Sequence, residues 1–192
     1  MADARYQDAV VEMSRALRQA PGDSFALGMR ATAYLQLQQP ERALRDIDAI
    51  LAARPDNPSI QLMRIGALDR LGRDEEADTA MRLLAQAHPE DQQITMAQAS
   101  LMLKHDRAQE ASDLLDRVIE ASPDDILSPQ LLRIEASIML NRLDLAAEEM
   151  ATVRQAHAGN AYVLNNLCWT AATKGVLLDQ ALRDCDAALA LE

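Results

Sequence analysis

Apolar and polar positions along the chain repeat at a nearly constant interval. An alanine marks this interval, because one recurs every 34 or 35 residues, at Ala43, Ala77, Ala111, Ala146 and Ala181. A mostly apolar residue follows each of these alanines after four positions and again after seven. Spacings of four and seven place all three positions on one side of an α-helix. The pattern therefore predicts a series of similar helices, each of which packs through one small residue.

Prolines and polar segments divide the same pattern into repeats. Pro21, Pro55, Pro89 and Pro123 lie 34 residues apart, in segments such as RPDNP at 54–58. Proline stops one helix there, and a nearby Asp or Ser can cap the next helix. A second break, which is polar or contains glycine, separates each repeat into halves. Each repeat is thus predicted to contain two helices of about 13–14 residues.

This organisation resembles the tetratricopeptide repeat (TPR) family in its period, helix pairing and composition. The matching residues in the first complete repeat are Ala31, Tyr34, Leu37, Ala43, Ile47 and Pro55. The Trp and Gly of the family's first helix are mostly replaced, and Ala158 stands where the fifth repeat should have Pro. The resemblance implies an all-α fold, namely a right-handed α-solenoid of antiparallel helix pairs with about eleven helices.

We expect a single TPR solenoid over residues 1–192. A lone second helix at 5–21 comes first, and the helix-pair repeats follow at 24–55, 58–89, 92–123, 127–158 and 161–192. Solenoids usually end in a capping element with a polar outer face, and the pattern shows none at the C-terminal end. Two interpretations stay open. The chain is a piece of a longer protein, or its uncapped ends pair in a homodimer.

In the TPR family the first helices of the repeats line a concave groove that holds ligands, and the resemblance implies such a groove here. Positions of the first helices that do not pack within a repeat are expected to face it, and few of them are charged. Such a surface suits a peptide or amphipathic helix with apolar anchors. The predicted groove residues are Phe25, Leu35, Leu62, Met96, Leu103, Leu131, Glu135, Ile138, Tyr162, Asn165 and Trp169. The alternative is that these side chains pack against the next repeat.

Arginine recurs at one position of the first helix, as Arg30, Arg64 and Arg133. Aspartates such as Asp46 and Asp48 follow in the second helix. We predict that these residues form structural ion pairs between helices rather than a ligand site. Exposed pairs of this kind contribute only about 0–1 kcal/mol each.

The two cysteines, Cys168 and Cys185, fall on the predicted buried faces of the two helices in the last repeat. Free cysteines commonly serve as small apolar core residues, and we predict that role here. A disulfide in an oxidising compartment is the alternative. Two thiols with no histidine nearby in sequence are too few ligands for a metal site.

Charge and motif content limit the classes of function. The 192 residues include 30 acidic and 19 basic side chains, which gives a net charge of −11. This charge repels phosphates, so we expect no nucleic-acid partner. No apolar run approaches the roughly 18–20 residues of a membrane span, so we expect no membrane insertion. The sequence contains no HExxH, GxxxxGK[ST] or GxGxxG motif, and we expect no catalytic residues, no metal and no cofactor.

The sequence thus favours a non-enzymatic scaffold that binds a peptide or helix of a partner protein in its concave groove. One alternative is an accessory or targeting region of a larger bacterial enzyme, such as a transglutaminase-like protein, because the last repeat resembles TPR segments of such proteins. Another alternative is a self-assembly module. The expected location is the cytoplasm or the periplasm of a bacterium.

Overall fold

The computed structural model describes residues 2–121 and 126–191, and these residues form eleven α-helices and no strand. The helices are α1 (Ala2–Gln19), α2 (Ser24–Gln36), α3 (Pro40–Ala53), α4 (Pro58–Arg70), α5 (Asp74–Ala87), α6 (Gln92–Lys104), α7 (Ala108–Ala121), α8 (Leu127–Met139), α9 (Leu143–Ala156), α10 (Ala161–Lys174) and α11 (Leu178–Leu189). The prediction of an all-α chain with about eleven helices is confirmed. The turn predicted at Pro123 lies outside the described residues.

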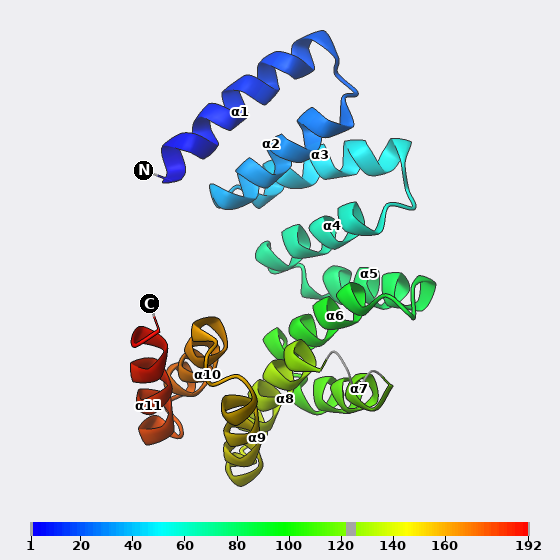
Figure 1. Cartoon of the computed structure of the whole chain (residues 1–192). Coiled ribbons are helices and arrows are strands. Elements are labelled where there is room, and N and C mark those ends of the chain that lie inside the picture. Colours follow the sequence, from blue (N-terminus) through cyan, green and yellow to red (C-terminus); the bar gives the residue numbers. More distant parts are fainter. Residues whose placement is uncertain (1, 122–125, 192) are drawn as a thin grey trace. The chain divides into compact units, whose positions relative to one another are not determined.

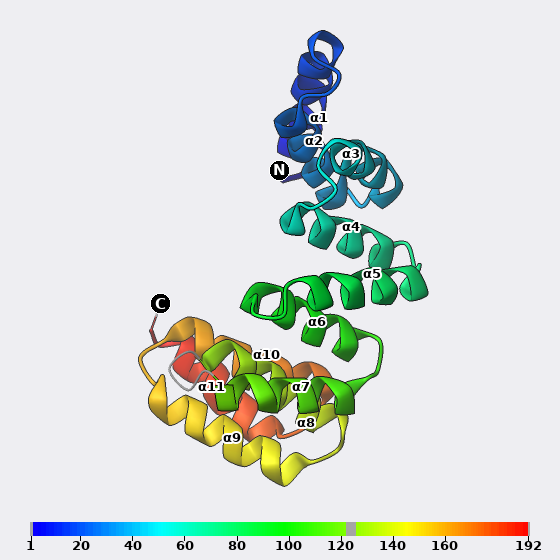
Figure 2. The ribbon, with the colours of Figure 1, turned by 90° about the vertical axis from the view of Figure 1, so that its right-hand side faces the viewer.

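The chain divides into two compact parts, which comprise residues 1–94 and 95–192. In the N-terminal part each helix from α1 to α5 packs against the next one in sequence (Figure 1). In the C-terminal part the helices from α7 to α11 do the same, and α8 also contacts α10 (Figure 2). Consecutive helices thus form the packed pairs that the periodic pattern predicts.

The recurring alanines lie where helices approach most closely. Ala43, Ala77, Ala111 and Ala146 have no exposed surface, and Ala181 is almost completely buried. A methyl group at these positions keeps two helix axes close, whereas a larger side chain would push them apart. The larger residues four positions later fill the remaining space between the helices, and Ile47, Met81, Leu115 and Met150 among them are buried.

The turn between the two helices of each repeat contains at least one residue with a left-handed backbone conformation. The φ angle there is 67° at Gly72 and 69° at Gly175, and it is 55° at Gln38, 58° at Asp106 and 56° at Asn141. Glycine adopts this conformation freely, and Asn and Asp tolerate it better than most residues do. A left-handed residue thus recurs in all five turns although only two of them use glycine, and the last turn contains a second one at Leu177, with a φ of 48°.

Side-chain caps fix the start of several first helices. Asp23 accepts a hydrogen bond from the backbone N–H of Phe25 at 2.9 Å, and Asn57 accepts one from Ile60 at 3.2 Å. These bonds satisfy backbone donors that have no partner within the helix. Among the described residues, no helix is both long and apolar enough to cross a membrane.

Candidate functional site

Helix α10 presents two aromatic side chains on one exposed face. Tyr162 and Trp169 keep 71% and 68% of their surface exposed, and Asn165 between them is also exposed. Steps of three and four residues return to the same side of a helix, so the three side chains form one stripe. The opposite face is buried and comprises Val163, Leu164, Leu167, Cys168 and Ala171. The stripe is therefore accessible to a partner while the helix is anchored from behind.

Local signals in the sequence fix the position of this stripe. The side chain of Asn160 accepts a hydrogen bond from the backbone N–H of Val163 at 3.3 Å, so α10 begins at Ala161. Gly175 ends the helix with a φ of 69°. Tyr162 consequently lies in the first turn, and Trp169 lies seven residues later, about 10 Å further along the axis.

Helix α8 borders α10 and carries three of the predicted groove residues, namely Leu131, Glu135 and Ile138. Leu131 is half-buried and packs against the core cluster of the C-terminal part. Glu135 is half-exposed, and its Oε1 lies 3.8 Å from Nζ of Lys174 on α10.

The N-terminal part has a smaller apolar patch on α2. Phe25 keeps 72% of its surface exposed, and Met29, one turn later, is also exposed. The groove prediction omits Met29, although its spacing of four residues from Phe25 places both on one side of the helix. Leu35 and Leu62 are half-buried, and so is Met96 in the C-terminal part.

Two predicted groove residues are core residues instead, so this part of the prediction is wrong. Leu103 is only 4% exposed and belongs to a cluster that contains Ala136 of α8. Ile138 is 6% exposed and belongs to a cluster that contains Ala171 of α10. The physical reason is the same in both cases, because the first helix of the following repeat covers the side chain. Neither residue offers surface to a partner.

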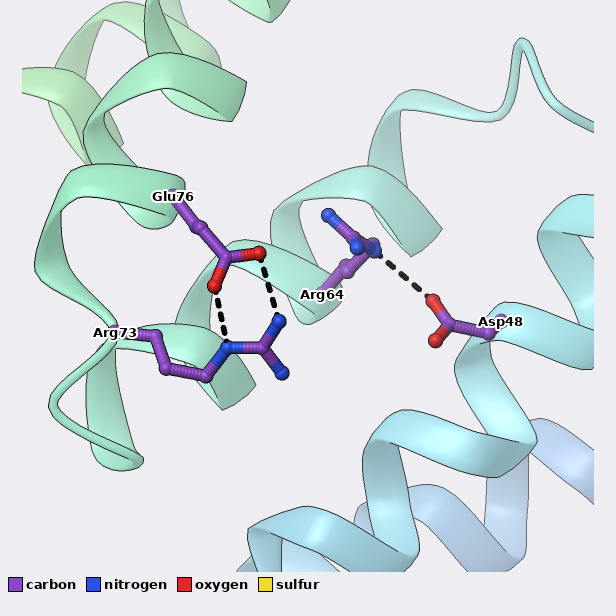
Figure 3. Close-up of polar contacts among 4 residues, drawn as sticks. All are labelled: Asp48, Arg64, Arg73 and Glu76. Atoms are coloured by element: carbon purple, nitrogen blue, oxygen red, sulfur yellow. Dashed lines mark hydrogen bonds and ion pairs between the residues drawn. The ribbon is translucent and has the colours of Figure 1, made fainter.

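The predicted ion pairs between helices are present. Arg30 donates two hydrogen bonds of 2.7 Å to the carboxylate of Asp46, and the hydrogen bonding raises the pKa of Arg30. Arg64 donates one hydrogen bond of 2.9 Å to Asp48 on the preceding helix (Figure 3). These contacts confirm the structural explanation of the arginine pattern for the pairs with Asp46 and Asp48.

Helices of the last repeats are joined by a disulfide, which the sequence leaves open as the alternative to free thiols, and by an ion pair that the sequence does not indicate. Cys168 and Cys185 form a disulfide between α10 and α11, with Cα atoms 5.3 Å apart, so the prediction of free thiols is wrong. Both sulfurs point into the interface of the two helices, which brings them together. Arg154 of α9 pairs with Asp184 of α11, whose side chain is completely buried. No other repeat has an arginine at the position of Arg154, so periodicity does not indicate this pair.

The carboxylates of the second helices differ in environment. Burial raises the pKa of Glu149, although its ion pair with Arg133 acts in the opposite direction. Glu76 is exposed, and hydrogen bonds from Arg73 hold its pKa below the usual range. The charged form of Glu149 is thus disfavoured by its loss of solvation, whereas Glu76 is charged at neutral pH.

Comparison with known proteins relates the chain to one repeat family. The family model described as a tetratricopeptide repeat matches residues 1–64. A tetratricopeptide repeat protein from Parabacteroides merdae is 17% identical, with a TM-score of 0.78 over 98% of this chain and 73% of that one. No curated protein sequence matches the chain.

Two further solved structures have a similar fold. MamA from Desulfovibrio magneticus is 18% identical, with a TM-score of 0.61 over 88% of this chain and 94% of that one. YrrB, described as a TPR protein with an unusual peptide-binding site, is 19% identical. Its TM-score is 0.55 over 94% of this chain and 92% of the other. At these identities the likeness concerns the arrangement of helices.

Proposed function

Because a tetratricopeptide repeat model matches residues 1–64 and the fold is similar to that of tetratricopeptide repeat proteins, we propose that the chain is a non-enzymatic scaffold for protein–protein interaction. Its ligand is a peptide or helix of a partner protein, which binds across the exposed faces of the first helices. Support comes from the fold, from similar proteins such as YrrB with its peptide-binding site, and from the absence of catalytic motifs in the sequence.

The exposed aromatic stripe on α10 is the observation that carries the proposal. The chain has only five aromatic residues, and two of them, Tyr162 and Trp169, are largely exposed on one helix face. Exposed aromatic side chains on one face are a recurring feature of interaction surfaces, because they bury a large area at little cost in conformational entropy. Their separation of about 10 Å along the helix matches apolar anchors at positions i and i+7 of a bound helix.

The surroundings of the stripe would add polar specificity to this apolar contact. The amide of Asn165 lies between the two rings in sequence and can hydrogen-bond the backbone of an extended peptide. Glu135 and Lys174 form an exposed ion pair that can exchange partners with charged groups of a ligand. The patch of Phe25 and Met29 offers a separate apolar contact in the N-terminal part.

The test is partner capture with a matched control. The full chain, a Trp169→Ala variant and a Leu145→Ala variant serve as baits in a lysate, followed by quantitative mass spectrometry. Leu145 is also an exposed apolar residue, but it lies on α9, a second helix. Capture of the specific partner should fall at least tenfold with Trp169→Ala and remain unchanged with Leu145→Ala. Equal capture by all three baits would contradict the proposed binding surface.

Direct titration then locates the contact on the chain. Trp169 is the single tryptophan, so its fluorescence reports burial at this position without a label. A peptide from the captured partner should shift the emission to shorter wavelength, and Tyr162→Ala should weaken the apparent affinity several-fold. An emission spectrum that stays unchanged at saturating peptide would exclude contact with the stripe.

Self-association is a second candidate function, favoured by the surface of α11. Leu178, Leu182 and Leu189 are all exposed on this one helix, and their spacings of four and seven residues place them on one side. Light scattering over a range of concentrations tests this function. A mass that rises with concentration and returns to that of a monomer in Leu182→Glu would support it, whereas a constant monomer mass would exclude it.

A further inference from the structure

Arg30 and Arg133 stand at the same position of their first helices, and each binds two partners, one on the preceding second helix and one in its own repeat. Arg30 shows the pattern in the N-terminal part. Its Nη1 donates to Oγ of Ser14 on α1 at 3.1 Å, and its Nε and Nη2 donate to Asp46 on α3 at 2.7 Å. The guanidinium thereby joins the second helices on both sides of α2.

Arg133 repeats this arrangement in the C-terminal part. It donates to Asp116 on α7 at 2.9 Å and lies 2.8 Å from Glu149 on α9. Within the repeat pattern Asp116 is equivalent to Ser14, and Glu149 is equivalent to Asp46. One carboxylate from the arginine's own repeat is thus present in both cases.

Arg64 has the first partner and lacks the second. Its Nε donates to Asp48 on α3, which corresponds to Ser14 and Asp116. The position of Asp46 and Glu149 is occupied by Ala80, whose methyl group accepts no hydrogen bond. No described residue takes a hydrogen bond from the terminal nitrogens of Arg64. Arg64 therefore keeps terminal N–H donors without a partner among the described residues, in a repeat that has Ala80 where other repeats hold a carboxylate.

A second carboxylate close to Arg64 is already engaged. Both oxygens of Glu76 accept hydrogen bonds of 2.7 Å from Arg73, and Figure 3 shows the carboxylate facing Arg73 while Arg64 faces Asp48. Arg64 lowers the pKa of Glu76 only as a minor contribution after Arg73. Glu76 consequently does not replace the missing side chain at Ala80.

A half-open hollow of about 310 Å³ lies at this place, within the N-terminal part. Arg64 and Ala80 line it together with apolar residues from three consecutive helices, which include Leu51 of α3, Ile65 of α4 and Leu83 of α5. Leu83 is largely exposed, so it is available to cover a bound group. The size falls at the lower end of small-molecule sites and suits one aliphatic group with a short polar end.

From this geometry we propose that the hollow binds a carboxylate carried next to a branched aliphatic group. The ligand carboxylate pairs with the terminal nitrogens of Arg64. It thereby replaces the acidic side chain that other repeats have, as Asp46 or Glu149, at the position of Ala80. Such charge-assisted pairs with arginine are short and directional. The aliphatic group packs against Leu51 and Leu83 and is thereby removed from contact with solvent. The hollow lies on other residues than the aromatic stripe, so the inference is independent of the proposed function.

Charges at the rim of the hollow fix the orientation of the ligand. Asp56 also lines it, from the turn that precedes α4, and this carboxylate repels an anion at that end. Arg64 lies almost two helical turns further along α4. The ligand carboxylate is therefore directed to Arg64 and the neutral part of the ligand to the end near Asp56. The carboxylate belongs either to a free acid or to the C-terminus of a peptide that ends in leucine.

The experiment titrates the full chain with N-acetyl-leucine and, as a control without the carboxylate, with N-acetyl-leucinamide. Backbone amide shifts in ¹H–¹⁵N spectra serve as the readout. We expect millimolar binding of the acid, with shifts concentrated at 61–65 and 80–88, and at least tenfold weaker binding of the amide. Binding of both compounds with the same affinity would overturn the proposal, and so would the absence of binding by the acid.

A variant pair tests the role of the missing carboxylate. Ala80→Asp supplies the side chain that Arg30 has in Asp46, so it should reduce acid binding at least tenfold while helicity stays unchanged. Thr79→Asp adds the same charge at the exposed neighbouring residue and should alter the affinity less than twofold. Equal losses in both variants, or no loss in Ala80→Asp, would refute the role of Arg64.

A final comparison distinguishes the two sources of the carboxylate. The tripeptide acetyl-Ala-Ala-Leu with a free C-terminus should bind at least tenfold more tightly than N-acetyl-leucine if the natural ligand is a peptide end. Equal affinities would identify a small free acid. Either result supports carboxylate recognition in the hollow, whereas failure of both compounds to bind refutes it.

Discussion

Removal of the carboxylate of Asp184 should destabilise the last repeats strongly. This side chain is completely buried on α11, and both of its oxygens pair with Arg154 of α9, one of them at 2.8 Å from Nη2. A guanidinium keeps its proton at neutral pH without any partner, so Arg154 stays charged when the carboxylate is lost. Asp184→Asn would leave that charge against a neutral amide inside the interface of α9 and α11.

The size of the effect follows from burial and distance. Two charge centres about 4 Å apart attract by about 4 kcal/mol at an effective dielectric constant of about 20. Removal of one member of a buried pair typically costs about 3–5 kcal/mol, since the other charge remains desolvated. The side chain of Arg154 keeps 28% of its surface exposed, so water solvates part of the unpaired charge. We therefore expect a loss of about 3 kcal/mol, at the lower end of this range.

Urea unfolding followed by Trp169 fluorescence measures this loss in the part of the chain that contains the pair. The matched control is Asp186→Asn, which removes the same charge from an exposed position of the same helix and should change stability by less than about 0.5 kcal/mol. The double variant Arg154→Met/Asp184→Leu removes both charges and should recover most of the stability. If Asp184→Asn unfolds at the same urea concentration as the wild type, the reasoning about the buried pair is refuted.

Three further predictions concern the disulfide, the helix contacts and pH. Reduction of Cys168–Cys185, or replacement of both by alanine, should lower the unfolding free energy by about 3 kcal/mol, because the bond closes a loop with a sequence separation of 17 residues. An identical urea midpoint with and without reductant would contradict this. Ala77→Leu should cost about 1–3 kcal/mol by overpacking a fully buried contact, and an unchanged melting temperature would show that the contact is not tight. The raised pKa of Glu149 means that the folded chain binds this proton more tightly than the unfolded chain does. Its contribution to stability should therefore increase as pH falls from neutral towards the ordinary value of 4.5. Unfolding curves across this range should show the wild type gaining stability relative to Glu149→Gln on acidification, and a constant difference would exclude the effect.

Much of the fold is predictable from this sequence because each repeat presents the same packing problem. The spacing of Ala43, Ala77 and Ala111 identifies the close helix contacts, and all three residues are buried as the pattern requires. The exposure of Trp169 is also predictable, because the buried positions of α10 already define the opposite face. Local periodicity thus identifies the buried faces within a repeat, but it does not distinguish free thiols at Cys168 and Cys185 from the disulfide that they form.

The errors in the groove prediction occur where the contact belongs to a neighbouring repeat. Leu103 and Ile138 are placed correctly on their helices, but the next first helix covers them, and periodicity does not give that coverage. The same limit explains why the pair of Arg154 and Asp184 is missed, since it joins two successive second helices. The hollow beside Arg64 exists because Ala80 has no carboxylate. The sequence alone does not show this, because only the structure shows that Asp46 and Glu149, at the same position, pair with the equivalent arginines.

The pairing of first-helix arginines with side chains on second helices also restricts how the series of repeats can change in evolution. Repeat proteins commonly gain or lose whole repeats by recombination, and a deletion of residues 58–91 would preserve the period of this chain. It would, however, place Gln98 beside Asp48, where Arg64 stands now, and would leave Asp48 without its cation. The repeats therefore share a shape but are not interchangeable, because Arg30 and Arg133 pair with second helices on both sides, whereas Arg64 pairs with the preceding one alone.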